Sequence, residues 1–304
     1  MKKLQLSIKA FLLTSVLFIS CTEIESVIEE EPCFGDNYTI QIDRLLTKLT
    51  TTHPGYLPTI RNYEYTYNSY NLLTEINEYT FDYDKYRIFN YACNNNLSLV
   101  TNEKESLKYD LKYDETSRIK SYKTTSTYLH DYELTYTGNI INVSGLINKK
   151  PNSTLTIETN DADLVIKITR IDNYSTFDYD ANGNLIRAKD FDSNNILLKD
   201  YEISYDSNPN PFYGQFKSNY LERFIHDFSE SAFYGIDYFF RFNQFGFPYL
   251  KNNPILLEDK KCTSCYNDLL KRTYEYDSQN YPVKMEESHV GAPAVTYEYQ
   301  YQYQ

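Results

Sequence analysis

Aromatic residues at every second position recur along this chain and limit the folds open to it. In the cleanest copy, residues 177–187, aromatic Phe177 and Tyr179 alternate with Asp178 and Asp180, an Asn182-Gly183 pair follows, and then comes a second alternating run. Asn and Gly both accept positive φ, so this pair favours a type I′ turn, whose twist matches the two strands that it joins. The segment is predicted to be a β-hairpin.

Weaker copies of the unit occur along much of the chain. They start at Tyr63, Leu107, Tyr132, Tyr201 and Tyr274, and the sequence ends in an alternating run, 297–303. Each copy places aromatic rings on one face and Glu, Thr, Gln or Lys on the other, which is the signature of a half-buried antiparallel strand. With 33 Tyr and 17 Phe available for a core, we predict an all-β fold: a large curved antiparallel sheet of repeated hairpins.

The segment Tyr179-Asp180-Ala181-Asn182-Gly183-Asn184-Leu185 resembles the core of a YD (Rhs-type) repeat. Copies with degenerate spacing cover roughly residues 60 to 304. The resemblance implies a curved meander of hairpins and implies no activity. Other copies, such as Tyr136-Thr137-Gly138-Asn139-Ile140, lack the Asp. The sequence therefore leaves open whether the sheet closes into a shell.

The N-terminus resembles a lipoprotein signal peptide, residues 1–20. Two lysines precede a short apolar stretch that ends in Ser20-Cys21, a small residue before the cysteine that lipoprotein signal peptidase cuts before. The stretch is too short to be a spanning helix. Acyl chains on Cys21 would anchor the protein at a membrane; the alternative is an ordinary secretory signal with an incidental cysteine.

Residues 21–36 are expected to form an acidic, flexible tether, since they carry a cluster of like charges and little to pack. An acidic stretch next to the lipidated cysteine resembles the surface-export signal of Bacteroidetes lipoproteins, some of which carry degenerate YD-like hairpins. This resemblance implies an outer-membrane location, facing outward. Residues 37–304 are expected to be a single repetitive β domain, in which 39–52 fit either a helix or, as we expect, a first strand.

One region, about residues 211–254, breaks the repeat. It is rich in Phe, and Ser218 could cap a short helix. Five apolar residues follow on one side of that helix at helical spacing, namely Tyr220, Leu221, Phe224, Ile225 and Phe228. The insertion is expected to place a helix against the concave face of the sheet, and the alternative is an aromatic binding cleft.

Little in the sequence indicates catalysis or a bound metal. Asp178 to Leu185 match the first eight positions of an EF-hand loop, but Lys189 stands where the bidentate Glu is needed. The four histidines form no known catalytic motif. Besides Cys21, an even number of cysteines remains for two disulfides of undecided pairing: Cys33, Cys93, Cys262 and Cys265. We expect no cofactor and no enzymatic activity.

The composition limits the kinds of partner that the protein is expected to bind. A net charge of −12 would repel a phosphate backbone, which excludes nucleic acid. A membrane-spanning barrel needs an apolar lipid-facing band, whereas these strands set Tyr against Lys, Glu and Thr. We expect a non-enzymatic, surface-attached lipoprotein with an unknown protein or glycan partner. The alternative is a glycan-binding or glycan-processing lipoprotein, although the absence of Trp removes the largest stacking platform.

Overall fold

The computed structural model describes most of the β domain. The described residues are 44–53, 59–79, 84–92, 94–102, 107–125, 130–215, 217–232, 236, 250–261, 270–289 and 296–304. The chain divides into two compact units, Met1–Pro32 and Cys33–Gln304, and all these residues belong to the second. Within them, no helix is long and apolar enough to cross a membrane.

Eighteen strands form one sheet. They are β1 Leu46–His53, β2 Thr59–Tyr67, β3 Leu73–Tyr79, β4 Asp84–Tyr91, β5 Leu97–Asn102, β6 Leu107–Tyr113, β7 Ile119–Thr124, β8 Asp131–Thr137, β9 Ile140–Ile147, β10 Lys150–Thr159, β11 Val165–Thr169, β12 Asn173–Tyr179, β13 Leu185–Asp192, β14 Leu197–Pro209, β15 Asn252–Asp259, β16 Leu270–Tyr276, β17 Pro282–His289 and β18 Thr296–Tyr303. Between β14 and β15 lie a 3-10 helix η1, Lys217–Asn219, and an α-helix α1, Tyr220–Phe228.

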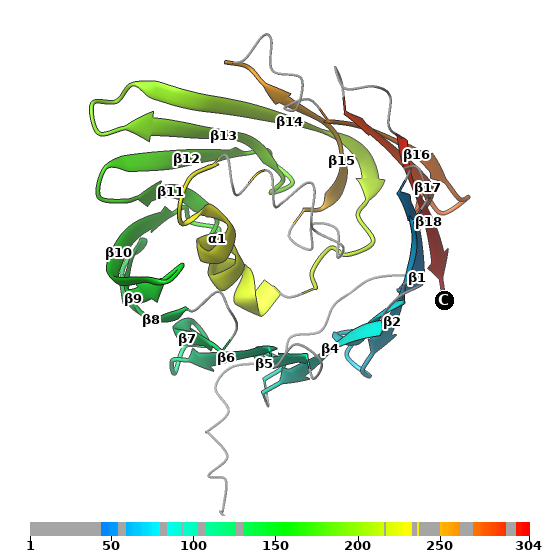
Figure 1. Cartoon of the computed structure of the whole chain (residues 1–304), viewed down its shortest axis with the longest axis horizontal. Coiled ribbons are helices and arrows are strands. Elements are labelled where there is room, and N and C mark those ends of the chain that lie inside the picture. The colour runs from blue at the N-terminus through cyan, green and yellow to red at the C-terminus, as the bar shows by residue number, and fades with distance from the viewer. Residues whose placement is uncertain are drawn as a thin grey trace, which may run out of the picture. The chain divides into compact units, whose positions relative to one another are not determined.

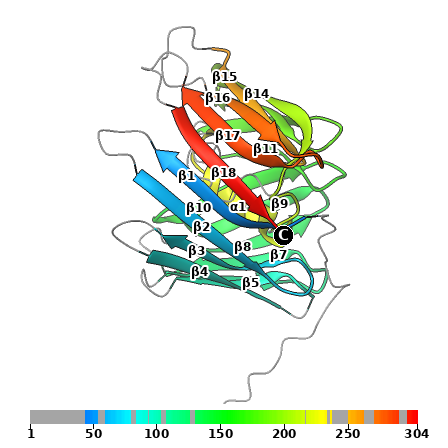
Figure 2. The same cartoon turned by 90° about the vertical axis from the view of Figure 1, so that its right-hand side faces the viewer.

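The sheet closes on itself. Each strand pairs antiparallel with the next one along the chain, and β18 pairs with β1, with Tyr301 opposite Leu49. Figure 1 shows the strands running around a ring, and Figure 2 shows the seam where β18, β1 and β2 lie side by side. The predicted all-β meander is confirmed, and the question of closure is answered. A closed sheet leaves no free edge for pairing with other chains.

The hairpin predicted at residues 177–187 is present, but its predicted type I′ turn is wrong. The turn has five residues, 180–184, and Asp180 controls it: one carboxylate oxygen accepts the amides of Asn182 at 2.8 Å and Asn184 at 2.9 Å. Gly183, at φ 84°, supplies the left-handed position, and Asn182 does not share it. An Asp that binds amides two and four residues ahead makes a longer turn more favourable than the two-residue one.

The same turn recurs around one end of the barrel and once at the other. Its first residue accepts the amides two and four positions later at Asn68, Asp114, Asn160, Asp192 and Asp277. The fourth residue has positive φ at Asn71, Ser117, Asp163, Asn195 and Asn280. The Asp or Asn of the repeat is thus the hydrogen-bond acceptor that shapes each turn.

The recurring Tyr before a turn also has a defined role. At or near the end of an even-numbered strand, its hydroxyl donates to the carbonyl of the first residue of the preceding strand. The pairs are Tyr67 to Leu46, Tyr91 to Leu73, Tyr113 to Leu97, Tyr136 to Ile119, Tyr179 to Val165, Tyr205 to Leu185 and Tyr303 to Pro282, at 2.6 to 2.8 Å. These bonds join neighbouring strands where the paired strands meet the turns.

Tyr113→Phe is expected to destabilise the protein by about 1 to 2 kcal/mol, because it removes the hydroxyl that the Leu97 carbonyl accepts and leaves that carbonyl without this donor. Urea unfolding followed by circular dichroism measures the change. Tyr70→Phe is the control, since the Tyr70 ring is 40% exposed on a turn and its loss should cost less than about 0.5 kcal/mol. Equal effects of the two substitutions would contradict the structural role of the Tyr113 hydroxyl.

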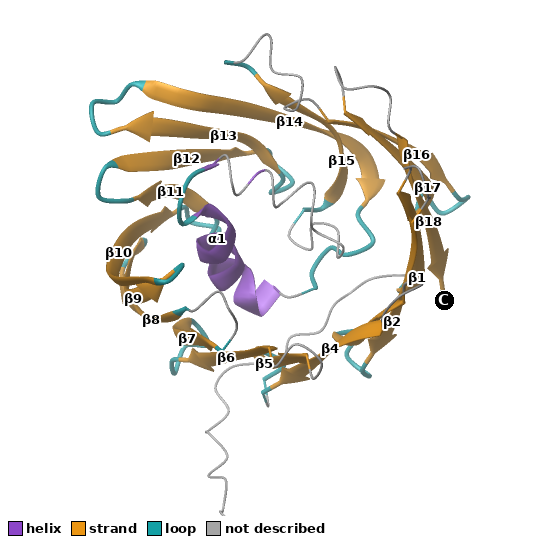
Figure 3. Cartoon of the chain, viewed as in Figure 1, coloured by secondary structure: helices purple, strands orange, loops and turns teal. Residues whose placement is uncertain are grey.

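The two faces of the sheet have opposite polarity. In β8, Tyr132 and Leu134 point inward and are buried, while Asp131, Glu133 and Thr135 between them are exposed. The hydrophobic core therefore lies inside the ring, against the helix seen there in Figure 3. A lipid-facing sheet has the reverse distribution, with an apolar outer band.

Candidate functional site inside the closed sheet

Helix α1 occupies the interior of the closed sheet. Phe224, Ile225 and Phe228 are buried, and the two Phe rings stack on each other at 4.5 Å. Both also meet the edge of Phe177 on β12, with ring centroids 4.9 and 5.1 Å apart. The helix predicted from the spacing of these residues is present. We call residues 210–215 and 217–232, which include this helix, the plug.

The start of the plug is bound to the wall through backbone amides. Gln215 accepts the amide of Leu73 at 3.0 Å, Ser218 that of Leu97 at 2.9 Å, and Tyr220 that of Val165 at 3.2 Å. These three amides belong to first residues of strands, whose carbonyls accept the Tyr hydroxyls described above. Ser218, expected to cap the helix, instead binds the wall.

The end of the plug is held by a buried arginine. Arg170, directly after β11, donates to the carbonyl of Ser229 at 2.8 Å and to that of Phe228. Burial lowers the pKa of this guanidinium to about 10, so it stays charged at neutral pH. A cation here satisfies helix carbonyls that have no partner within the helix and favours the negative end of the helix dipole.

Asp190 completes this attachment from β13. Its carboxylate accepts the amide of Ala232 at 2.8 Å and the hydroxyl of Ser175, and Ser175 also accepts a hydrogen bond from Arg170 at 3.0 Å. Asp190 is buried and its charge acts on Arg170. The plug is therefore tied to β3, β5 and β11 at its start and to β11 and β13 at its end.

The plug brings two histidines together against the wall. The rings of His130, just before β8, and His226, on α1, lie 5.3 Å apart. Asp227 contacts the Nδ1 of His226 at 2.9 Å, and Tyr122 and Tyr132 flank His130. The backbone amide of Asn148 donates to the Nδ1 of His130 at 3.4 Å. This hydrogen bond places the ring proton of neutral His130 on Nε2.

Burial, reinforced by the charge of His226, lowers the pKa of His130 from 6.5 to about 4. Between pH 6.5 and about 4, the unfolded chain thus binds a proton at His130 that the folded chain does not bind. Stability is expected to fall as the pH drops from about 6.5 towards 4, by up to about 3 kcal/mol. Urea unfolding between pH 7 and 5 measures the slope.

His130→Gln is the comparison for this pH dependence, because it removes the titrating group and keeps a polar side chain. Its stability is expected to change less than that of the wild type over the same interval. Hydrogen bonds from turn amides or from arginines keep the pKa of the Asp114, Asp200 and Asp277 carboxyls below its usual value, so these groups stay ionised over this interval. Parallel curves for the two proteins would refute the assignment to His130.

The sites predicted from sequence fall mostly outside the described residues: Cys21, Cys33, Cys93, Cys262 and Cys265 all lie there. In the loop compared with an EF-hand, Asp180 is committed to turn amides and to the side chain of Asn184, and Asp178 lies 3.9 Å from Lys189. Among the residues that the structure describes, no group of three or more His, Cys, Asp or Glu side chains could hold a metal ion.

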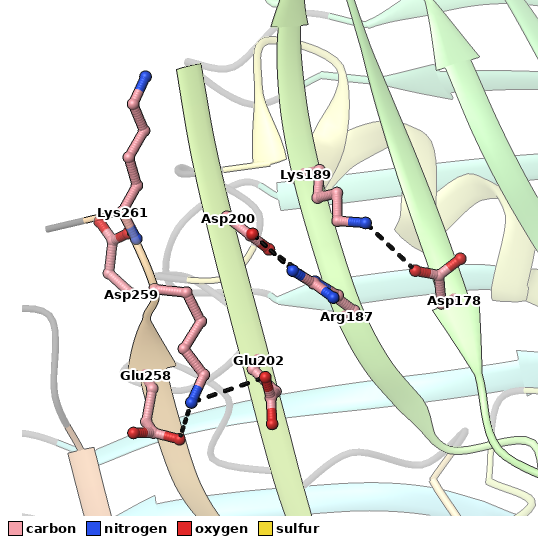
Figure 4. A network of polar contacts seen from close by, with 9 residues as sticks. Asp178, Arg187, Lys189, Asp200, Glu202, Glu258, Asp259 and Lys261 are labelled. Atoms are coloured by element: carbon pink, nitrogen blue, oxygen red, sulfur yellow. Dashed lines mark hydrogen bonds and ion pairs between the residues drawn. The ribbon is translucent and has the colours of Figure 1, made fainter. Parts of the chain in front are cut away.

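The outer wall carries charges in cross-strand pairs (Figure 4). Arg187 of β13 donates two hydrogen bonds of 2.7 Å to Asp200 of β14, which keeps the pKa of that carboxyl below its usual value. Lys260, next to the end of β15, lies 2.7 Å from Glu258 and 3.6 Å from Glu202. Such pairs suit a surface that faces water and add little stability each.

Comparisons with known proteins give structural similarities alone. No protein-family model and no curated protein matches the sequence. A porin-like protein from Bacteroides uniformis is 13% identical with a TM-score of 0.47, over 85% of this chain and 98% of that one. The TcdB2-TccC3-TEV structure is 9% identical with a TM-score of 0.27, over 90% of this chain and 14% of that one. The Photorhabdus luminescens Tc holotoxin pore is 12% identical with a TM-score of 0.22, over 78% and 11%.

Sequence reasoning missed the interior polar groups. His130 and His226 are distant in sequence and form no motif, so their contact depends on how the plug enters the ring. Arg170 and Asp190 belong to no motif that singles them out in the sequence. The one available signal was the strand alternation, which places Asp190 on the same inward face as Ala188.

Proposed function

We propose that this protein is a non-enzymatic lipoprotein, attached to the outer membrane through Cys21 and facing outward, whose closed sheet serves as an interaction or cell-envelope module. The observation that carries the proposal is the pairing of a charged, water-facing outer wall with an interior in which a helix is fixed at both ends. Such a body offers its outer surface, and not its interior, to partners.

The burial of the interior titratable groups supports a non-enzymatic role. His130 is 1% exposed, and α1 covers it from one side while Tyr122 and Tyr132 cover it from the wall. A substrate would have to displace α1 before it could reach this imidazole. A general acid or base must lie within hydrogen-bond reach of the group that it serves, and this arrangement favours a packed core.

The lipid attachment rests on the sequence around Cys21. A lipidated cysteine followed by an acidic tether would hold the barrel near the membrane without a spanning segment. The barrel would then meet partners through its outer wall, where charged side chains already pair with one another. A partner would bind by competing with these pairs or by contacting the apolar residues among them.

Cys21→Ala, compared with the wild type in the native organism, tests the attachment. We expect the wild-type mature chain to begin at an acylated Cys21 by intact mass and to be removed from whole cells by protease. The variant should lose both properties. Cys33→Ala is the matched control, since it removes a cysteine of the same region and should leave acylation unchanged. An unlipidated or protease-protected wild type would refute a surface lipoprotein.

Partner capture from envelope extracts tests the interaction role. The lipidated protein is expected to enrich a protein or a glycan over an unrelated lipid-anchored control. Enrichment should persist when the glycans are removed if the partner is a protein. A failure to enrich either class over the control would count against an interaction module.

A further inference from the structure

The tips of two adjacent hairpins expose apolar side chains. Ile171, in the turn between β11 and β12, is 81% exposed. In the neighbouring hairpin, β13–β14, Ile196 of the turn is 58% exposed and Leu198 is 44% exposed. Figure 1 shows these two tips side by side at the outside of the ring. Burial of large aliphatic side chains such as these is favourable by about 1.5 to 3 kcal/mol each, so their joint exposure needs an explanation.

An aromatic pair lies one step behind the tips on the same outward face. Tyr174 of β12 stacks on Phe191 of β13 with centroids 4.8 Å apart and ring planes 11° apart. The Tyr174 hydroxyl donates to the side chain of Asn195 at 3.0 Å, which joins the first hairpin to the turn of the second. We call Ile171, Tyr174, Phe191, Ile196 and Leu198 the tip patch.

Basic residues lie immediately behind the aromatic pair. The ammonium of Lys167 lies 5.3 Å from the centre of the Tyr174 ring. The next positions along β12 to β14 carry Lys189 paired with Asp178, and Arg187 paired with Asp200 (Figure 4). Away from the tips, the large side chains thus change from aliphatic to aromatic to basic, while the carboxylates of Asp172 and Asp192 lie at the tips.

This order matches the layers of a bilayer surface. Aliphatic side chains favour the acyl region, aromatic rings favour the interface, and lysines extend to the headgroups. The aliphatic residues stand in or beside projecting turns rather than in a groove, so they suit a soft phase that closes around them. We propose that the tip patch inserts into the surface of a lipid bilayer.

The charges at the tips indicate which lipids are preferred. Asp172, exposed beside Ile171, places a carboxylate at one tip. Asp192 places another at the second tip, where it accepts the amides of Asn194 at 2.9 Å and Ile196 at 2.8 Å. These carboxylates oppose anionic headgroups. Binding is therefore expected to be at least as strong on zwitterionic vesicles as on vesicles that contain anionic lipid.

This inference is independent of lipid on Cys21. If the chain is anchored, the tip patch orients the barrel on the membrane; if it is not, the patch provides a weaker contact of its own. Flotation with vesicles reports attachment of the chain by any means, whereas a probe at position 171 reports the tips alone. The two proposals can therefore fail separately.

The chain contains no Trp, so Ile171→Trp introduces a single fluorophore at the tip. With the full chain on phosphatidylcholine vesicles, Trp fluorescence is expected to shift to the blue and to be quenched by brominated lipid. Tyr70→Trp, in the turn between β2 and β3 at the opposite end of the strands, is the matched control and should remain unquenched. An unquenched probe at 171 on vesicles that bind the chain, or equal quenching at 70, would overturn the proposal.

Ile171→Asp combined with Ile196→Asp tests the energetic contribution of the tips. In the Cys21→Ala background, the double variant is expected to bind phosphatidylcholine vesicles at least about tenfold more weakly than the parent. Its circular dichroism spectrum should match that of the parent, because both side chains are exposed on turns. Unchanged vesicle binding, or a parent that shows no binding at all, would overturn the insertion.

Discussion

Gly145→Ala is expected to destabilise the protein by about 3 kcal/mol, the larger of two glycine effects in the same hairpin. Gly145, in β9, has φ 143°, and a β-carbon there would lie 2.4 Å from the carbonyl oxygen of Asp131 and 2.8 Å from the α-carbon of Tyr132. Both atoms are backbone, so no side-chain rotation relieves the clash. The pairing of β8 with β9 must shift, next to the strand that carries Tyr132 against the plug.

Gly138→Ala is the matched control in the turn between the same two strands. Gly138 has φ 58°, and nothing lies within 4 Å of a β-carbon built on it. The substitution should cost about 1 kcal/mol, which is the strain of a left-handed conformation alone. Urea unfolding compares the two variants. If Gly145→Ala were no worse than Gly138→Ala, the close approach of β8 to β9 would not be a constraint on the fold.

Local features of the fold were accessible from sequence because they depend on periodicity. The alternation around Phe177 and Tyr179 predicts a hairpin, and the helical spacing of Phe224, Ile225 and Phe228 predicts a helix. Both patterns show which side chains of a strand or helix are buried, and burial against any apolar surface produces such a pattern. They required no knowledge of the partner surface.

The turn type and the closure depend on interactions that periodicity does not contain. The Asn182-Gly183 pair suggested a two-residue turn, but Asp180 satisfies two amides of a longer one and determines the loop. Closure requires β1 and β18, at opposite ends of the domain, to meet with Leu49 opposite Tyr301. Bulges increase strand twist, and they recur next to the turns, as at Tyr67, Tyr91 and Tyr113. The alternation of residues within a strand does not show these bulges.

The interior site could not be predicted from the sequence, for a related reason. The side-chain oxygen of Gln215 can accept a hydrogen bond from any backbone amide that comes close to it. It accepts the amide of Leu73 because of the path that the plug takes inside the ring, and the sequence does not show that path. In the same way, His226 meets His130 because α1 runs along β7 and β11. Polar contacts of an insertion are thus determined by tertiary position, whereas its apolar face is visible in the sequence.

Arg170→Met is expected to destabilise the protein by about 3 to 5 kcal/mol, because it leaves the buried carboxylate of Asp190 without its cation. It also removes the donors to the carbonyls of Phe228 and Ser229, which should loosen the end of α1 before the sheet unfolds. Compared with the wild type, hydrogen exchange in the variant should therefore increase more for the amides of α1 than for those of β3 to β5.

Arg187→Met is the matched control for this arginine. Arg187 pairs with Asp200 on the outer wall, its side chain is 39% exposed, and the charges of Lys189 and Lys260 still act on Asp200 when Arg187 is removed. Its loss should cost less than about 1 kcal/mol and should leave exchange in α1 unchanged. Adding Asp190→Asn to Arg170→Met should recover part of the lost stability, because the stranded charge is removed as well. If the double variant were no more stable than Arg170→Met alone, the contribution of Arg170 would lie in its bonds to the helix end rather than in charge compensation within the barrel.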